Sequence, residues 1–376
     1  MKPPRVISGV CLSVNPKGCM AAVNTWIAAA KAMPALASGP KSVLVLGCSG
    51  GYGLAARIVA AFSAGALTFG VSFERPPTVK RRGTPGWYNN LAFDAAAAES
   101  GLFSETLVAD AFLNATRETV VARARECHLP PFDLVVYSIA APQRTDPVSD
   151  VTYRSVIKPI GRALSGRTLD VASGALTDVV LEPATDEEVE ATVRVMGGED
   201  WSLWIRALKA AGLLADGART VAFSYIGPES THAIYRSGTL GKAKEHLEKT
   251  AAELGRELAP LHGQSHVAVC KALITRASSV IPVMSVYLSA LYRVMKAKGL
   301  HEGCMEQMNR LFRERLYTGG AVPTDDAGRI RLDDWELRPD VQSEIACILS
   351  RVTPDNIAEL TDTAGCRGEL LALYGF

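Results

Sequence analysis

Residues 41–53 read KSVLVLGCSGGYG, an apolar run followed by four glycines in seven residues. The apolar run is typical of a buried strand, and LAARIVAAFSA at residues 54–64 is typical of a helix. Glycine permits a tight turn and a close approach of ligand to backbone, while the N-terminus of a helix offers N–H donors to an anion. The stretch therefore predicts a strand–loop–helix unit that holds a phosphate group. A plain turn, or the cofactor site of a methyltransferase, remains the alternative.

Further apolar runs continue this alternation along the chain. We predict five more strands, in ALTFGVSFE (66–74), ETLVADA (105–111), DLVVYSIA (133–140), RTVAFSYIG (219–227) and SHVAVCKALIT (265–275). The helices between them include residues 114–128, with Asn114 as N-cap, and residues 242–258, supported by a Glu245–Lys249 pair. Short apolar strands separated by helices predict an α/β fold, a Rossmann-type doubly wound parallel sheet with helices on both faces.

Two insertions interrupt the alternation, at residues 75–103 and 143–200. The first predicts a loop and an alanine-rich helix. The second predicts small antiparallel strands and then helices, the first of which starts at a capping box at Thr185 and ends at Gly197. Residues 300–376 are expected to be mostly helical, apart from a short hairpin in RIRLDDWEL (329–337). Because we find no long linker, we expect a single domain over residues 1–376.

Composition excludes several classes of protein. A net charge of +1 gives no general attraction to nucleic acid or membrane surfaces. The eight cysteines form no C-x-x-C pair, so we expect no metal site and a reduced, cytoplasmic protein. The uncharged stretch at residues 277–292 is too short and too rich in serine for a membrane span. We expect it to form a helix of the soluble protein, capped by Ser278 or Ser279 and with Pro282 in its first turn.

The glycines and the end of the next strand point to a dinucleotide. Gly47 would turn the chain, and Gly51 and Gly53 would admit a pyrophosphate and let the helix pack on the sheet. Glu74 ends the second strand, where an acid can accept hydrogen bonds from the adenosine ribose and repel a 2′-phosphate, so NAD(H) is favoured. Arg75 beside it weakens that preference, because a guanidinium could hold the phosphate.

Two further strand ends would complete the cofactor crevice. Ligands of open α/β sheets collect at the carboxyl ends of the strands. Asp110 and Ala111 close the third strand, where the adenine would lie, and Ser138, Ile139 and Ala140 close the fourth, beside the nicotinamide ribose.

Tyr235 and Lys244 are the candidate catalytic pair. A tyrosine can donate a proton to a carbonyl oxygen, and a nearby lysine lowers the tyrosine pKa and can hold the cofactor ribose. Eight residues separate the two, so on one straight helix they would face opposite sides. They converge only if Tyr235 precedes the helix, and Gly238 and Gly241 would permit that break. Tyr225 is a rival proton donor or a second substrate contact, and Lys242 is hard to separate from Lys244 by chemistry alone.

The sequence resembles one family within the short-chain dehydrogenase superfamily, the FabV-type enoyl-ACP reductases and the trans-2-enoyl-CoA reductases. The resemblance covers nearly the whole chain and rests on GCSGGYG (47–53), FERP (73–76), YSIAAPQRTDP (137–147), SYIGPESTHAIYRSGTLGKAK (224–244) and LITRASSVIPVM (273–284). The eight-residue spacer is the most specific feature, since classical short-chain dehydrogenases use three residues and FabI-type reductases six. Gly50 departs from the pattern, where a larger residue is expected.

The resemblance implies NADH-dependent reduction of the trans-2 double bond of an enoyl thioester, carried by coenzyme A or acyl-carrier protein, in fatty-acid synthesis. It implies Tyr235 as proton donor, Lys244 as the cofactor-binding lysine and Tyr225 as a substrate contact. It also implies a monomer, and an acyl pocket covered by the helix of residues 277–292. Together with Lys244, the expected cofactor contacts are Gly47, Cys48, Ser49, Gly50, Gly51, Tyr52, Phe73, Glu74, Asp110, Ala111, Ile139, Ala140, Leu273, Ile274 and Thr275.

Two other functions fit the same fold. A carbonyl-reducing short-chain dehydrogenase is disfavoured by the eight-residue spacer. A non-catalytic NAD-binding protein is disfavoured by the presence of both Tyr235 and Lys244.

Overall fold

The computed structural model describes residues 4–7, 10–171, 173–281 and 283–376. Its centre is a seven-stranded sheet in which every pairing is parallel, as predicted. The strand order is β13, β12, β11, β6, β3, β4, β5, with bounds Ile330–Arg331, Gln264–Val269, Leu214–Ser224, Phe132–Tyr137, Ser42–Leu46, Leu67–Ser72 and Ser104–Val108. All five residues of β3 are buried, as expected for a parallel strand covered on both faces.

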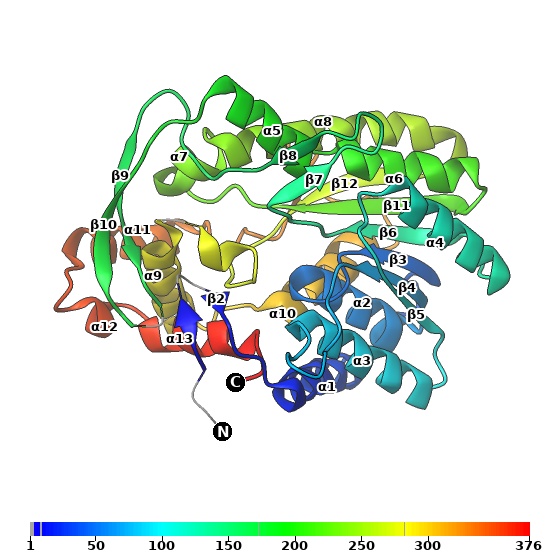
Figure 1. Cartoon of the computed structure of the whole chain (residues 1–376), viewed down its shortest axis with the longest axis horizontal. Coiled ribbons are helices and arrows are strands. Elements are labelled where there is room, and N and C mark those ends of the chain that lie inside the picture. Colours follow the sequence, from blue (N-terminus) through cyan, green and yellow to red (C-terminus); the bar gives the residue numbers. More distant parts are fainter. Residues whose placement is uncertain (1–3, 8–9, 172, 282) are drawn as a thin grey trace.

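Helices cover both faces of this sheet (Figure 1). One face carries α1 (Pro16–Ala32), α2 (Gly51–Ala64), α3 (Pro85–Glu99) and α10 (Cys304–Arg310), which continues into a π-helix over Leu311–Leu316. The other face carries α4 (Asn114–Glu126), α6 (Glu199–Ala210) and α8 (Thr239–Leu258). Apolar side chains of each helix set pack onto the sheet and form two separate cores.

A third core lies beside the sheet, around α9 (Met284–Ala297). It is built with α11 (Pro339–Arg351) and α13 (Thr363–Ala372), and α12 (Ile357–Leu360) connects the two. Figure 1 shows this group, in yellow to red, next to the ribbon formed by β9 (Leu164–Leu169) and β10 (Leu176–Leu181). The N-terminal hairpin of β1 (Val6–Ile7) and β2 (Val10–Cys11) lies beside it.

The second insertion folds as predicted. β7 (Gln143–Thr145) pairs antiparallel with β8 (Thr152–Arg154), and β9 pairs antiparallel with β10. The capping box at Thr185 is present, with reciprocal bonds to Glu188, and α5 (Asp186–Met196) ends at Gly197.

Several local predictions were wrong. Asn114 is not the N-cap of α4, because the cap position is Leu113 and the Asn114 side chain accepts a bond from Arg117 instead. Glu245 pairs with Lys242, three residues before it, rather than with Lys249. In the first insertion the helix begins earlier than expected, at Pro85, and includes the WYNN stretch. No prediction covered α1, which packs on α2 and α3.

Three differences lie near the end of the chain. RIRLDDWEL forms no hairpin, because β13 pairs in parallel with β12 at the edge of the main sheet. The sixth predicted strand ends at Val269, and a loop follows. The uncharged stretch begins as a short 3₁₀ turn, and α9 starts only at Met284 without a side-chain cap. Pro282 lies outside the described residues.

The connections reverse direction between β3 and β6. The chain runs outward on one side through β4 and β5, then returns to build β6, β11 and β12 on the other. In open α/β sheets this switch point is where ligands bind, at the carboxyl ends of the strands. Within the described ranges, no helix is both long enough and apolar enough to cross a bilayer.

Candidate active site

The glycine loop has the tight geometry that its sequence predicts. Gly47 adopts a left-handed conformation, with φ of 88°, and a side chain there would lie 2.1 Å from the carbonyl oxygen of Ser138. A side chain at Gly53 would lie 2.1 Å from the carbonyl oxygen of Gly47. Glycine at these two positions therefore lets the ends of β3 and β6 and the first turn of α2 pack together. The loop leads into α2, whose first N–H groups and dipole favour an anion.

This geometry predicts losses of stability of different size for alanine at two glycines of one loop. We expect Gly53→Ala to lower the free energy of unfolding by about 2–3 kcal/mol, since the new methyl group overlaps the Gly47 carbonyl. Gly50→Ala is expected to cost at most about 1 kcal/mol, because the site is extended and no atom lies within 4 Å of the added carbon. Urea unfolding of both variants measures the difference, and equal losses would contradict this packing.

Glu74 is held in place beside the loop. Its Oε1 accepts bonds from the hydroxyl of Ser49 at 2.7 Å and from the guanidinium of Arg276 at 2.8 Å. Its Oε2 is buried and has no hydrogen-bond partner among the described residues. A buried carboxylate oxygen without a donor is costly to leave unpaired, so it fits a ligand hydroxyl such as that of the adenosine ribose. The residues present therefore suit NAD(H).

The other predicted adenosine contacts lie at the strand ends as expected. Asp110 Oδ1 accepts from the N–H of Phe112, and the carbonyl oxygen of Ala111 accepts from the indole of Trp204. Ala140, expected beside the nicotinamide ribose, is exposed. Phe73, next to Glu74, is exposed as well, with a relative exposure of 78%. Such an exposed ring suits a contact with adenine.

Two side chains of the loop do not face the crevice freely. The thiol of Cys48 is fully buried near Arg57, so only its backbone can meet a cofactor. Tyr52 donates to the carbonyl oxygen of Lys271 at 2.7 Å, and its ring packs on Phe223. Tyr52 therefore links the loop to the ends of β11 and β12.

The break predicted between Tyr235 and Lys244 is present. Tyr235 ends the short helix α7 (His232–Tyr235), and Gly238 is the extended N-cap of α8. Lys244 lies in the second turn of α8 and faces the sheet, where its ammonium donates to the carbonyl oxygen of Phe223 at 3.1 Å. Lys242 is exposed and paired with Glu245, so Lys244 is the better placed of the two lysines to reach a ligand at the sheet.

Burial perturbs both groups of this pair. Desolvation lowers the pKa of Lys244 to about 8, although Glu248 nearby acts in the opposite sense. Burial, and then the negative charge of Glu336, raises the pKa of Tyr235. The hydroxyl of Tyr235 has no hydrogen-bond partner among the described residues. It is therefore a protonated phenol that is free to donate to a ligand.

Tyr225 lies against Tyr235, with ring centroids 4.6 Å apart in an edge-to-face contact. Its hydroxyl donates to Glu336 at 2.7 Å, and burial together with that carboxylate raises the pKa of Tyr225. The proton of Tyr225 is thus already engaged, unlike that of Tyr235.

The segment Leu273–Thr275 continues from β12 toward the loop. Thr275 lies beside Gly51, since a carbon added to that glycine would be 3.8 Å from its methyl group. Ser278, expected as a helix cap, instead accepts from the N–H of Thr275 and donates to the carbonyl oxygen of Leu273. A small hollow of about 20 Å³, partly open to solvent, begins at Ile274 and is lined further by Val171, Ser278, Ser279, Ile281, Ser285, Leu288 and Leu370.

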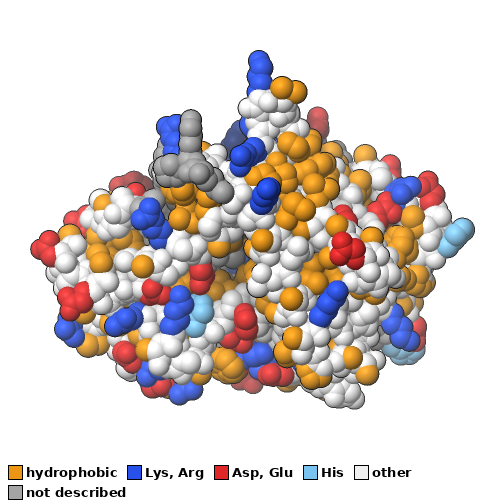
Figure 2. All heavy atoms as spheres, turned by 90° about the horizontal axis from the view of Figure 1, so that it is seen from below, with side chains coloured by type: hydrophobic (Ala, Val, Ile, Leu, Met, Phe, Trp, Pro, Cys, Tyr) orange, Lys and Arg blue, Asp and Glu red, His pale blue; other side chains and the backbone are white. Residues whose placement is uncertain are grey.

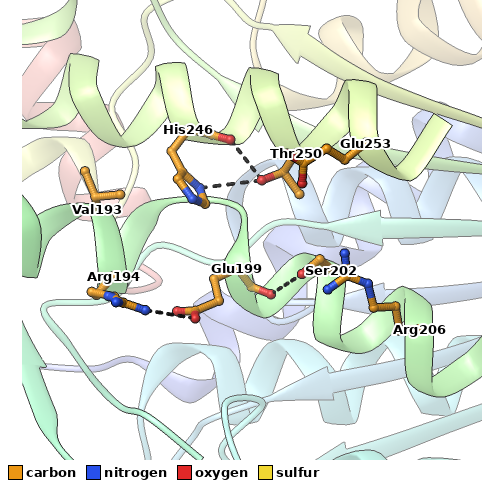
Figure 3. A pocket seen from close by; sticks show the side chains of 8 residues that line it. All are labelled: Val193, Arg194, Glu199, Ser202, Arg206, His246, Thr250 and Glu253. Atoms are coloured by element: carbon orange, nitrogen blue, oxygen red, sulfur yellow. Dashed lines mark hydrogen bonds and ion pairs between the residues drawn. The ribbon is translucent and has the colours of Figure 1, made fainter. Parts of the chain in front are cut away.

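A second hollow, of about 210 Å³, lies away from these groups, between α8 and the junction of α5 and α6 (Figure 3). His246 and Thr250 of α8 face Arg194 and Glu199 across it, and the last two pair with each other at 3.0 Å. Its charged side chains largely satisfy one another, as on a solvated surface. None of the predicted site residues lines it.

The sequence reading missed two charged residues of the site. Arg276 directly follows Thr275, a predicted cofactor contact, so its place in the sequence could have indicated that it belongs to the site. Glu336 lies within RIRLDDWEL, which was predicted to form a short hairpin, and the structure buries its side chain completely. Within the described ranges, no His, Cys, Asp and Glu side chains gather to hold a metal ion.

Comparison with known families agrees with this geometry. Residues 81–317 match the family described as the trans-2-enoyl-CoA reductase catalytic region, and residues 1–79 match its NAD(P)H binding domain. The chain belongs to this family. Residues 324–376 match a third region, described as the enoyl reductase FAD binding domain.

Individual relatives extend over the whole chain. It is 51% identical to the trans-2-enoyl-CoA reductase [NADH] of Treponema denticola, over 99% of this chain and 95% of that protein. It is 49% identical to an enoyl-[acyl-carrier-protein] reductase [NADH] of Coxiella burnetii, over 99% of this chain and 92% of that protein. The crystal structure of the Treponema enzyme with NAD superposes with a TM-score of 0.94 at 50% identity, covering 100% of this chain and 94% of that one. The crystal structure of the Clostridium acetobutulicum trans-2-enoyl-CoA reductase with NADH superposes with a TM-score of 0.96 at 41% identity. It also covers 100% of this chain and 94% of that one.

The C-terminal region does not fit a flavin dinucleotide. Its inward side chains, such as Val341, Ile345 and Leu370, are buried against α9, and Glu336 is occupied by protein donors. Its glycines do not follow the G-x-G-x-x-G spacing. We therefore derive no chemistry from FAD in this chain.

Proposed function

We propose that this protein is an NADH-dependent enoyl thioester reductase, in which Tyr235 is the proton donor and Lys244 assists it. The observation that supports this most is the free hydroxyl of Tyr235, whose ring packs on Tyr225 directly after β11. Lys244 bonds Phe223 of the same strand, and Tyr52 of the glycine loop packs on the same residue. The catalytic pair and the phosphate cradle therefore adjoin one another.

The cofactor would lie across the switch point. Gly47–Gly51 and the start of α2 would hold its pyrophosphate, Glu74 its adenosine ribose, Lys244 its other ribose, and Leu273–Thr275 would adjoin the nicotinamide. Bound NADH supplies the hydride that is added to the β-carbon of the substrate.

The residues of the chain then serve the carbonyl group. Reduction at the β-carbon places negative charge on the thioester carbonyl oxygen. The Tyr235 hydroxyl donates to that oxygen and supplies a proton, and the positive charge of Lys244 favours this transfer. Tyr225 contacts the substrate beside Tyr235, and the acyl chain enters at the small hollow beside Ile274, which must widen to hold it. Leu288 of α9 lines this hollow and also packs in the third core with Met284 and Tyr287.

The reaction is tested by following NADH absorbance with crotonyl-CoA, and then with a panel of ketones. We expect loss of NADH with the enoyl thioester only. Loss with the ketones alone would favour a carbonyl reductase, and NADH binding without any turnover would favour a non-catalytic role.

The physiological carrier can be coenzyme A or acyl-carrier protein. Arg75, Lys80 and Arg81 are exposed on the loop before α3 and could meet phosphate groups of either. Figure 2 shows acidic and basic side chains interspersed on one face, with a hollow near its middle. We propose action as a monomeric, single-domain enzyme in the cytoplasm, which sedimentation and cell fractionation can check.

Glu74 is expected to set the preference for NADH. We predict that Glu74→Ala lowers the ratio of kcat/KM for NADH over NADPH at least about 10-fold, because it removes an acceptor for ribose and frees Arg276 for a phosphate. Glu99→Ala is the control, since Glu99 is exposed at the end of α3, which leads to the amino ends of the strands. An unchanged ratio in Glu74→Ala would contradict this role.

A further inference from the structure

Glu336 is an unusually enclosed carboxylate. It is 0% exposed and belongs to the segment between β13 and α11. Its Oε1 accepts from the hydroxyls of Tyr225 and Tyr287, both at 2.7 Å, and its Oε2 accepts from the N–H of Ala272 at 2.7 Å. These three donors come from three different parts of the chain, so Glu336 ties together the ends of β11 and β12 and helix α9.

Among the described residues, no cationic side chain forms a direct ion pair with Glu336, so other groups must compensate its charge. Hydrogen bonds to a charged acceptor are stronger than neutral ones, and three of them replace the lost hydration. The ammonium of Lys271, itself buried, favours the ionised form of Glu336, although burial raises the pKa of this carboxyl group. A buried carboxylate destabilises the protein when one of its hydrogen-bond donors is displaced. Glu336 therefore favours the conformation in which all three donors stay in place.

One of those partners touches the proton donor. Tyr225 has its hydroxyl on Glu336 and its ring edge-to-face against the ring of Tyr235, 4.6 Å between centroids. Glu336 therefore sets the direction of the Tyr225 ring, and that ring forms one wall of the site of Tyr235. Glu336 also engages the proton of Tyr225, so of these two tyrosines it is Tyr235 whose hydroxyl stays free to donate.

We propose that Glu336 is a positioning residue of the reductase, which acts on the reaction through Tyr225. This inference rests on the proposed function, in which Tyr235 is the proton donor. The inference also gives the C-terminal region a role other than flavin binding, because this region contains Glu336 and places its carboxylate beside Tyr225.

The proposal is tested by a double-mutant cycle on kcat with NADH and crotonyl-CoA. Glu336→Gln and Tyr225→Phe are each expected to lower kcat about 10-fold, because both weaken or remove the charge-assisted hydrogen bond between these two side chains. NADH affinity, measured by fluorescence, should stay unchanged. If Glu336 acts through Tyr225, the double variant loses no more than about 2-fold beyond Tyr225→Phe, since coupled residues are not additive. A merely structural role would cost the same in both backgrounds.

Asp333→Asn is the matched control. Asp333 is an equally buried carboxylate of the same segment, but it pairs with Arg331 and does not contact Tyr225. If Glu336→Gln does not fold, Glu336→Asp takes its place, because it keeps the charge but draws the oxygen back from the tyrosine. Equal kcat losses in the Asp333 and Glu336 variants, or losses that multiply in the double variant, would overturn the proposal. A wild-type protein without turnover would instead overturn the proposed function, and this inference with it.

Discussion

Replacing Tyr235 with phenylalanine is expected to lower kcat about 100-fold or more with NADH and crotonyl-CoA, the range found when a general acid is lost. The fold should survive, because the Tyr235 hydroxyl bonds no described residue and its removal leaves no partner unpaired. NADH affinity should be unchanged. Steady-state kinetics and fluorescence titration of the purified variant measure both quantities.

Tyr225→Phe provides the comparison for this result. Its hydroxyl is bonded to Glu336, so its loss should reduce kcat less than loss of the Tyr235 hydroxyl. If Tyr225→Phe abolished turnover while Tyr235→Phe kept it, the proton donor would be Tyr225 and the assignment would be wrong.

Replacing Lys244 with methionine has the second-largest expected effect, a loss of about 100-fold or more in kcat/KM, since a charge beside the reacting proton is removed. Lys242→Met is the control, because Lys242 is exposed on the same helix and pairs only with Glu245. NADH binding should weaken in the first variant and not in the second. Equal activity of the two variants would contradict the role of Lys244.

The same lysine predicts a pH dependence. Its pKa is lowered to about 8, so the free enzyme should lose kcat/KM as the pH rises through about 8. Burying its charge costs stability below that pH, and the cost disappears as the pH rises toward the ordinary value of 10.5. At pH 7, Lys244→Met should therefore raise the free energy of unfolding by about 1–2 kcal/mol. A variant less stable than wild type at pH 7 would contradict this sign.

The sequence predicted those parts of the site that are formed by residues close together along the chain. The loop at residues 47–53 was recognisable because a strand, glycines and a helix follow one another directly. The break at Gly238 followed from helical geometry, since Tyr235 and Lys244 could not otherwise converge. The capping box at Thr185 was predicted for the same reason, because its two partners are three residues apart.

Contacts between residues far apart along the chain could not be predicted from the sequence. RIRLDDWEL suggested a hairpin by its alternation, but β13 pairs with β12, about sixty residues earlier. The burial of Glu336 depends on that pairing, and so do its bonds to Tyr225 and Tyr287. In the same way, the hydrogen bond between Arg276 and Glu74 joins residues about two hundred positions apart, and no local sequence pattern indicates it. The Glu245–Lys249 prediction failed because Lys242 was an equally near partner.

The central claim is reduction of a carbon–carbon double bond by NADH, and product analysis tests it most directly. Wild-type protein would be incubated with NADH and crotonyl-CoA, and the products identified by mass spectrometry alongside NADH absorbance. We predict that each NADH consumed yields one saturated thioester, heavier than the substrate by two hydrogens. An aldehyde or alcohol product, or no NADH loss even with a longer enoyl thioester, would contradict the account.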